Sequence, residues 1–206
     1  MAFQSYWFFT QLPENIIKII ENDVSKNFDQ QINESTLLGD SIDTQIRNSK
    51  NAWIPSSYWV GGFLWYYAER ANRENFLYDL RNIDQESLQY TIYQEGHFYD
   101  WHTDSSLPTH YKPQTTGNDQ GSLIQDFLNL QTEYVRKLSF VIQLSNPDDY
   151  EGGNLEIKDD LGNVYTAPKD QGTVIFFDSR SLHRVTKIEK GTRKSIVGWV
   201  VGPRWK

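Results

Sequence analysis

Residues able to bind a transition metal stand at two places in the second half of the chain. His102 and Asp104 are two residues apart, and His183 lies downstream in the strand-like run 182–188. Residues i and i+2 of an extended strand point to the same side of a sheet, so we expect His102 and Asp104 to face together. Two histidines and one carboxylate can occupy one face of an iron(II) ion and leave the opposite positions open for a cosubstrate and oxygen.

Two further residues extend this set. Arg193 carries a planar guanidinium that can grip a carboxylate with two hydrogen bonds, and Trp199 follows it. A His-x-Asp pair alone is a weak signal, because a surface strand with polar residues facing solvent would show it too. The whole ordered set, with Gly152-Gly153 between the two histidine segments, favours a metal site that works with an anionic cosubstrate.

Composition limits what this site and this protein can be. The 206 residues include no cysteine, so disulfides and thiolate metal sites are excluded, and a metal must be held by histidine and carboxylate. A net charge of -7 argues against broad nucleic-acid binding, which needs a basic surface. No apolar run approaches the length of a membrane span, and the first residues do not resemble a signal peptide. We therefore expect a cytoplasmic protein without a membrane segment.

The first third of the chain predicts helices. A short aromatic strand is expected over 3–9 and a helix over 13–28, where isoleucines and Val24 follow helical spacing. A second helix is expected to about residue 72, capped by Ser56 or Ser57. We expect the aromatic face of this second helix to be core; it consists of Trp59, Phe63 and Tyr66 or Tyr67.

The rest of the chain reads as short strands separated by turns, including one at Lys190-Gly191, which is typical of a sandwich or jelly roll. The polar stretch 105–134 interrupts this pattern, and we expect either a lid over the metal or a mobile surface loop. One domain is expected over 1–206, with a strand and supporting helices over about 1–84 and the β core over about 85–206. The expected strands are 88–93, 97–104, 137–144, 154–158, 163–167, 173–177, 182–188 and 194–201.

At these residues the chain resembles the prolyl 4-hydroxylase-like branch of the iron(II)/2-oxoglutarate-dependent oxygenases. The resemblance covers about 88–199 and runs through Tyr-Gln-Glu-Gly-His-Phe-Tyr-Asp-Trp-His-Thr-Asp (93–104), 136–144, Tyr-Glu-Gly-Gly-Asn-Leu-Glu-Ile (150–157) and 183–199. It implies a mainly β fold, a double-stranded β-helix or jelly roll braced by N-terminal helices.

The resemblance also implies roles for particular residues. The residues implied to bind iron are His102, Asp104 and His183. Those implied to bind 2-oxoglutarate are Arg193, Tyr93 and Gln143. Those implied to contact a peptide substrate are Tyr99, Arg136 and Trp199. Read from the residues alone, Tyr93, Tyr99 and Trp199 could equally be packing residues and Arg136 a solvated edge charge. Neither His97 nor His110 completes a better ligand set.

Two positions depart from relatives. Many collagen-type enzymes use lysine where this chain has Arg193, and several relatives carry tyrosine at the position of Gln143. Both changes keep a hydrogen-bonding group, so they leave cofactor use intact and weaken only the assignment of a substrate.

The implied activity is hydroxylation of an unactivated C–H bond, with C4 of a prolyl residue in a peptide or protein as the favoured target. The implied cofactors are Fe(II), 2-oxoglutarate and O2, with ascorbate as an optional addition, and the coproducts are succinate and carbon dioxide. A lysyl or small-molecule hydroxylase, a non-enzymatic jelly-roll binding module and a zinc hydrolase remain alternatives. Arg193 favours the oxygenase over the last two, and the oligomeric state is left open.

Overall fold

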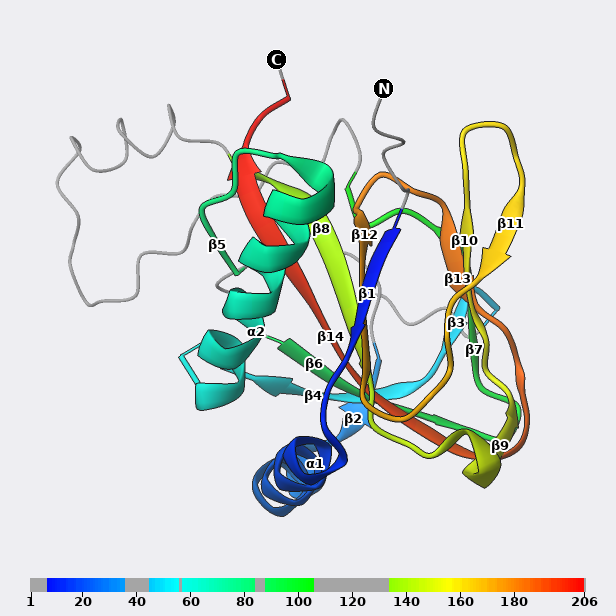
Figure 1. The fold of residues 1–206 in the computed structure, drawn as a ribbon. Coiled ribbons are helices and arrows are strands. Elements are labelled where there is room, and N and C mark those ends of the chain that lie inside the picture. The colour runs from blue at the N-terminus through cyan, green and yellow to red at the C-terminus, as the bar shows by residue number, and fades with distance from the viewer. Residues whose placement is uncertain (1–6, 36–44, 56, 84–87, 106–133, 206) are drawn as a thin grey trace, which may run out of the picture.

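A computed structural model of the protein describes residues 7–35, 45–55, 57–83, 88–105 and 134–205. Two antiparallel sheets face each other, and two helices cover the outer side of the larger sheet (Figure 1). The helical elements are α1 (Glu14–Phe28), η1 (Asp29–Gln31), α2 (Trp59–Ala71), the π-helical turn η2 (Asn72–Phe76) and η3 (Pro147–Asp149).

The larger sheet contains nine strands, and the smaller sheet contains five. Along the larger sheet the order is β1 (Trp7–Gln11), β12 (Thr173–Asp178), β8 (Tyr134–Gln143), β14 (Ile188–Pro203), β6 (Leu88–Gln94), β4 (Lys50–Ile54) and β2 (Asn33–Glu34), with β5 (Asn82–Ile83) and β9 (Tyr150–Gly152) also paired to β14. Along the smaller sheet the order is β11 (Val164–Thr166), β10 (Leu155–Lys158), β13 (His183–Val185), β7 (Phe98–His102) and β3 (Arg47–Asn48).

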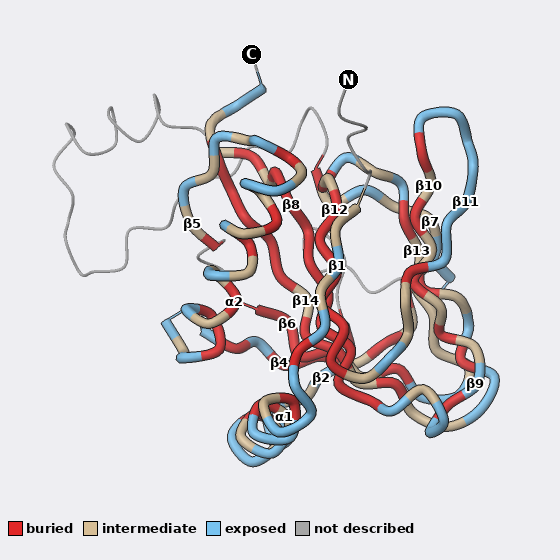
Figure 2. The backbone as a smooth tube through the Cα atoms, viewed as in Figure 1, coloured by how far each residue is buried: buried red, intermediate tan, exposed pale blue. Residues whose placement is uncertain are grey.

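The predicted first helix is confirmed. Pro13 occupies the N-cap position and α1 begins at Glu14. Its buried residues recur every three or four positions, so they form one stripe that packs on the larger sheet, while the opposite side is exposed (Figure 2). This helix therefore braces the sheet, as the sequence predicts.

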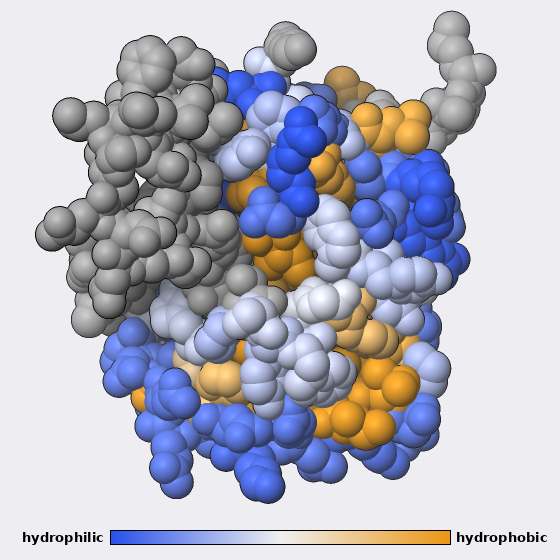
Figure 3. Space-filling model, turned by 90° about the vertical axis from the view of Figure 1, so that its left-hand side faces the viewer, coloured by the Kyte–Doolittle hydropathy of each residue, from blue (hydrophilic) through white to orange (hydrophobic). Residues whose placement is uncertain are grey.

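The second helix differs from the prediction. It is preceded by Tyr58 at the N-cap, without a side-chain cap, so the expected cap by Ser56 or Ser57 is wrong. The buried face consists of small and aliphatic residues, whereas Trp59 is 43% exposed and Tyr66 is 61% exposed. The expected aromatic core face is wrong for Trp59, whose indole N–H instead donates to the Asp23 carboxylate. Phe63 and Tyr67 are partly buried and pack against the core, as the sequence predicts. Figure 3 views the molecule from this side and shows hydrophobic (orange) and weakly hydrophilic (pale) residues among the strongly hydrophilic ones.

The larger sheet is buried on both faces, which explains its continuous apolar runs. Side chains on one face pack against α1 and α2, and those on the other face the smaller sheet. One expected turn, Lys190-Gly191, instead lies within the 16-residue strand β14, where Gly191 has φ +79° and pairs with Tyr150 of β9. The chain does not reverse here: Gly191 lies just beyond a register shift between Ile188 and Lys190, and its lack of a side chain lets the backbone of Asp149 and Tyr150 approach closely.

The predicted strands of the β core are otherwise present, with ends displaced by a few residues. The polar stretch over 30–51 contributes β2, β3 and part of β4, none of which its sequence predicts. The expected lid over 105–134 falls almost entirely outside the described residues, as does His110. The division into one domain stays a prediction.

Candidate metal centre

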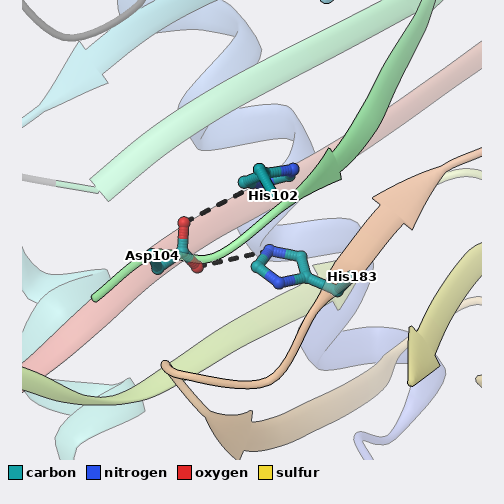
Figure 4. Close-up of side chains that lie close together, drawn as sticks. All are labelled: His102, Asp104 and His183. Carbon is teal, nitrogen blue, oxygen red and sulfur yellow. Dashed lines mark ion pairs between the residues drawn. The ribbon is translucent and has the colours of Figure 1, made fainter. Parts of the chain in front are cut away.

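The three predicted metal ligands come together between the two sheets. His102 ends β7, His183 begins β13, and the two residues are paired across these neighbouring strands. Asp104 follows β7 by two residues, and one candidate ligand atom from each residue lies within 4.8 Å of the others (Figure 4). The Asp104 carboxylate lies 3.4 Å from His183 Nε2 and 3.8 Å from His102 Nε2. The sequence prediction that these side chains converge is confirmed.

The orientation of both imidazoles is fixed by backbone carbonyls. His102 Nδ1 lies 2.7 Å from the carbonyl oxygen of Asp100, and His183 Nδ1 lies 2.9 Å from that of Ser181. A carbonyl only accepts, so each Nδ1 carries the proton when the ring is neutral and each Nε2 presents a lone pair. Both lone pairs are directed to the side where Asp104 lies, which suits metal binding.

Asp104 is not aimed by strand alternation, because β7 ends at His102. Its backbone N–H and that of Ser105 donate to the carbonyl of Ser179, at 2.9 and 3.0 Å. Its side chain accepts a hydrogen bond of 2.6 Å from Ser139 Oγ, which lies 3.0 Å from Ser179 Oγ. Ser139 therefore holds the carboxylate, Ser179 supports Ser139 and the Asp104 backbone, and neither serine was predicted from the sequence.

One turn supports both Asp104 and His183. It runs from Asp178 to Ser181 and supplies the carbonyls of Ser179 and Ser181 described above. The Asp178 carboxylate organises this turn, since it accepts from the backbone and guanidinium of Arg180 and from the hydroxyl of Tyr78 at 2.7 Å.

The electrostatics of the site suit a cation. Burial would raise the pKa of Asp104, but attraction to and hydrogen bonding with His183, together with the charges of His102 and Arg136, hold that pKa well below its usual range. Burial, together with repulsion from His183, lowers the pKa of His102 to about 4. Burial would also lower the pKa of His183, but attraction to Asp104 together with the hydrogen bonds to Asp104 and the Ser181 carbonyl raises that pKa. An ionised carboxylate facing two imidazole Nε2 atoms is a donor set that divalent iron accepts.

The predicted cosubstrate residues also meet. Arg193 is 1% exposed, its Nε donates to Gln143 Oε1 at 3.2 Å, and one Nη donates to Ser195 Oγ at 3.4 Å. Tyr93 is paired with Arg193 across the sheet, and its ring centre lies 5.5 Å from the guanidinium carbon. Within the described residues Arg193 forms no ion pair with a carboxylate. A buried charge without a counter-ion is costly, so this arginine fits a bound anionic ligand such as a dicarboxylate.

The predicted substrate residues lie beside the metal ligands. The Tyr99 ring stacks on the His102 ring with centres 3.5 Å apart and planes 15° apart. The Arg136 guanidinium carbon lies 3.9 Å from the centre of the Trp199 ring, and Trp199 is paired with Ser139, the residue that holds Asp104. His97 lies on the turn before β7 and is not part of the cluster.

None of the helices in the described part of the chain combines the length and the apolar character that crossing a membrane requires.

Comparison with known families gives one match. The model of the 2OG-Fe(II) oxygenase superfamily matches residues 88–201, which include β6 to most of β14 and all three candidate metal ligands.

Curated relatives carry the name PKHD-type hydroxylase. One from a Psychrobacter species is 33% identical over 111 residues, which are 54% of this chain and 36% of the relative. One from Xylella fastidiosa is 32% identical over 112 residues, which are 54% of this chain and 43% of the relative. The matched part therefore spans less than half the length of these relatives.

Solved structures are similar over nearly the whole chain. A prolyl-4-hydroxylase from Pseudomonas putida gives a TM-score of 0.65 at 19% identity, covering 97% of this chain and 93% of its own. A prolyl hydroxylase from Trichoplax adhaerens, solved with a peptide fragment of the hypoxia-inducible factor oxygen degradation domain, gives 0.69 at 16% identity, covering 96% and 84%. At such identities the likeness shows the fold, and the predicted jelly roll is confirmed.

Proposed function

The chain belongs to the 2OG-Fe(II) oxygenase superfamily, and we propose that it is an iron(II)- and 2-oxoglutarate-dependent dioxygenase that hydroxylates a prolyl residue in a peptide or protein. The observation that carries this proposal is the convergence of His102, Asp104 and His183, whose candidate ligand atoms lie within 4.8 Å of one another. In this proposal the two Nε2 atoms and the Asp104 carboxylate hold the iron.

Arg193, in this proposal, binds the far carboxylate of 2-oxoglutarate. The buried guanidinium, without a carboxylate partner in the described part of the chain, supports this role. Gln143 fixes the direction of the guanidinium by accepting a hydrogen bond from Arg193 Nε, and the Tyr93 ring lies beside the guanidinium. When bound, iron(II), 2-oxoglutarate and O2 would supply an oxidative decarboxylation that releases succinate and carbon dioxide, with one oxygen atom of O2 going to succinate and the other to a C–H bond.

The protein's own part is to position these groups and to hold the substrate. Tyr99 orders His102 by stacking on it, and Trp199 lies beside Ser139, so a substrate held by these residues lies close to the metal ligands. Both structural relatives described above are named as prolyl hydroxylases, and one is solved with a peptide, which supports a peptidyl substrate here. The C4 regiochemistry and a cytoplasmic location stay predictions.

A coupled assay tests the proposal. Purified protein is incubated in air with iron(II), 2-oxoglutarate and an array of proline-containing peptides. Succinate is quantified, and the peptide masses are measured by mass spectrometry. We expect succinate formation that depends on iron and a mass gain of one oxygen on a prolyl residue. His183→Ala should abolish both. Succinate without any modified peptide would retain the oxygenase and reject the prolyl substrate; absence of succinate under all conditions would reject the oxygenase.

A further inference from the structure

Tyr150 lies next to the proposed cosubstrate arginine. It begins β9 and is paired with Gly191 of β14, and Arg193 follows two positions along the same strand. Residues two apart on a strand point to the same side, so the pairing places Tyr150 on the side of the sheet where Arg193 lies. Tyr150 is 4% exposed and belongs to a buried cluster with Tyr93, which also contacts the guanidinium.

The two side chains pack against one backbone position. A Cβ placed on Gly153, which has φ +60°, would lie 3.2 Å from Arg193 Cδ and 3.3 Å from Tyr150 Cε2. The absence of a side chain at Gly153 therefore leaves room for both the arginine and the tyrosine beside this backbone position. Lys169 adds a second cation, since its Nζ lies 4.2 Å from the centre of the Tyr150 ring.

The Tyr150 hydroxyl is unsatisfied. Its oxygen is buried and has no hydrogen-bond partner among the residues that the structure describes. Buried hydroxyls are normally paired, so one left over beside a cation without a counter-ion indicates a missing acceptor. Burial raises the pKa of this hydroxyl, against the opposing effect of Arg193, so at neutral pH it keeps its proton and can donate.

We propose that the Tyr150 hydroxyl is a second ligand of the far carboxylate of 2-oxoglutarate, donating a hydrogen bond beside the guanidinium of Arg193. This inference rests on the proposed function. Arg193 uses its Nε and one Nη on Gln143 and Ser195, which leaves the other Nη for the carboxylate, and the phenol would donate to a second acceptor position of that group. The carboxylate in turn gives both the buried charge and the buried hydroxyl a partner.

Equilibrium binding tests the proposal without turnover. The protein is loaded with Mn(II) in place of iron, and binding of 2-oxoglutarate and of 2-oxopentanoate is measured by calorimetry. The second compound keeps the 1-carboxylate and 2-oxo groups but lacks the far carboxylate. In Tyr150→Phe, which removes only the hydroxyl, 2-oxoglutarate should bind roughly ten- to a hundredfold more weakly, with binding of 2-oxopentanoate unchanged.

The matched control is Tyr90→Phe. This substitution also removes a buried hydroxyl. In the wild type that hydroxyl lies 3.2 Å from Ser25 Oγ, on the helix-covered side of the same sheet. This variant should bind both compounds like the wild type. Comparing the two compounds within one variant removes any general loss of folded protein from the result.

The outcomes separate the two proposals. Wild-type protein that binds 2-oxoglutarate no better than 2-oxopentanoate would reject Arg193 as a carboxylate site, and the proposed function with it. Wild-type protein that prefers 2-oxoglutarate, with the same preference retained in Tyr150→Phe, would overturn only the role of Tyr150. An equal loss for both compounds in Tyr150→Phe would also overturn it, because the tyrosine would then support the site as a whole.

Discussion

Ser139 Oγ donates a hydrogen bond of 2.6 Å to Oδ2 of Asp104, the carboxylate that faces both candidate histidine ligands. Ser139 lies on β8 of the larger sheet, whereas the histidines lie on strands of the smaller sheet. This bond therefore ties the candidate metal centre to the sheet opposite, and it fixes which carboxylate oxygen remains available.

Removing this bond should weaken metal binding. Ser139→Ala leaves Asp104 without its side-chain donor, and loss of such a supporting bond typically costs about 10–100-fold in metal affinity. The measurement is a titration of the protein with iron(II) under anaerobic conditions. Ser25→Ala is the control, because Ser25 also bonds a buried partner, Tyr90, but on the helix-covered side of the larger sheet. Equal affinities in the two variants would contradict the role given to Ser139.

The turn 178–181 should affect metal affinity, although none of its residues is a candidate ligand. Asp178→Asn weakens the bonds to Arg180 and Tyr78, so the carbonyls that hold Asp104 and His183 lose their fixed positions. We expect about a tenfold or larger loss of iron affinity. The same titration checks it.

Asp159→Asn is the matched control for Asp178. Asp159 organises the turn between β10 and β11 in the same way, since it accepts from the backbone N–H groups of Leu161 and Asn163. That turn makes no contact with a candidate ligand among the described residues, so its variant should keep wild-type iron affinity. A larger loss in Asp159→Asn would reject the proposed link.

Replacing Arg193 should weaken cosubstrate binding far more than it lowers stability. Arg193→Met removes a charge-assisted bond worth about 1.5–3 kcal/mol, so 2-oxoglutarate affinity should fall by one to two decades. The protein without cosubstrate should lose little stability, because an unpaired buried charge disappears with the side chain. Thermal unfolding with and without 2-oxoglutarate measures both effects, since a bound ligand raises the melting temperature. Arg193→Lys should be milder, as it keeps the charge and loses the two-pronged grip. An undiminished shift in Arg193→Met would make this arginine structural.

Replacing Gly153 should weaken cosubstrate binding. In Gly153→Ala the new methyl would lie 2.3 Å from Ile188 Cδ1 and 3.2 Å from Arg193 Cδ, so the arginine must shift. We expect a loss of stability of about 1–3 kcal/mol and weaker 2-oxoglutarate binding. Gly162→Ala is the control, because Gly162 has φ +87° but no atom near its Cβ position. It should show backbone strain alone, of about 1–2 kcal/mol, with cosubstrate binding intact. Matching losses of binding would contradict the packing argument.

The residue types and order of the metal ligands could be predicted from the sequence, but their support could not. The chain has only four histidines, so the ordered set of His102, Asp104 and His183 with Arg193 stands out. Ser139 and Ser179 belong to a common residue type and follow no spacing rule, since they meet only after β8 and β12 pair. Their role depends on contacts between strands that are far apart in the sequence.

In the fold, too, some features follow from the sequence pattern and others depend on contacts between distant segments. Helical spacing in α1 predicts its buried stripe, because apolar residues recur there every three or four positions and polar residues fill most of the others. In α2 apolar residues occur on every side, so the sequence pattern does not distinguish the buried face from the exposed Trp59 and Tyr66. Gly191 likewise predicts a departure from regular backbone, but only the pairing of β9 with β14 decides that the strand continues through it.

The most direct test of the central claim is an anaerobic titration of the protein with iron(II) and 2-oxoglutarate, followed by the visible absorption that arises when a 2-oxo acid chelates iron(II). The account predicts that the absorption saturates at one iron per chain, that it is lost in His183→Ala, and that Arg193→Met shifts it to higher 2-oxoglutarate concentration. The same absorption in His183→Ala as in the wild type, at the same concentrations, would contradict the account.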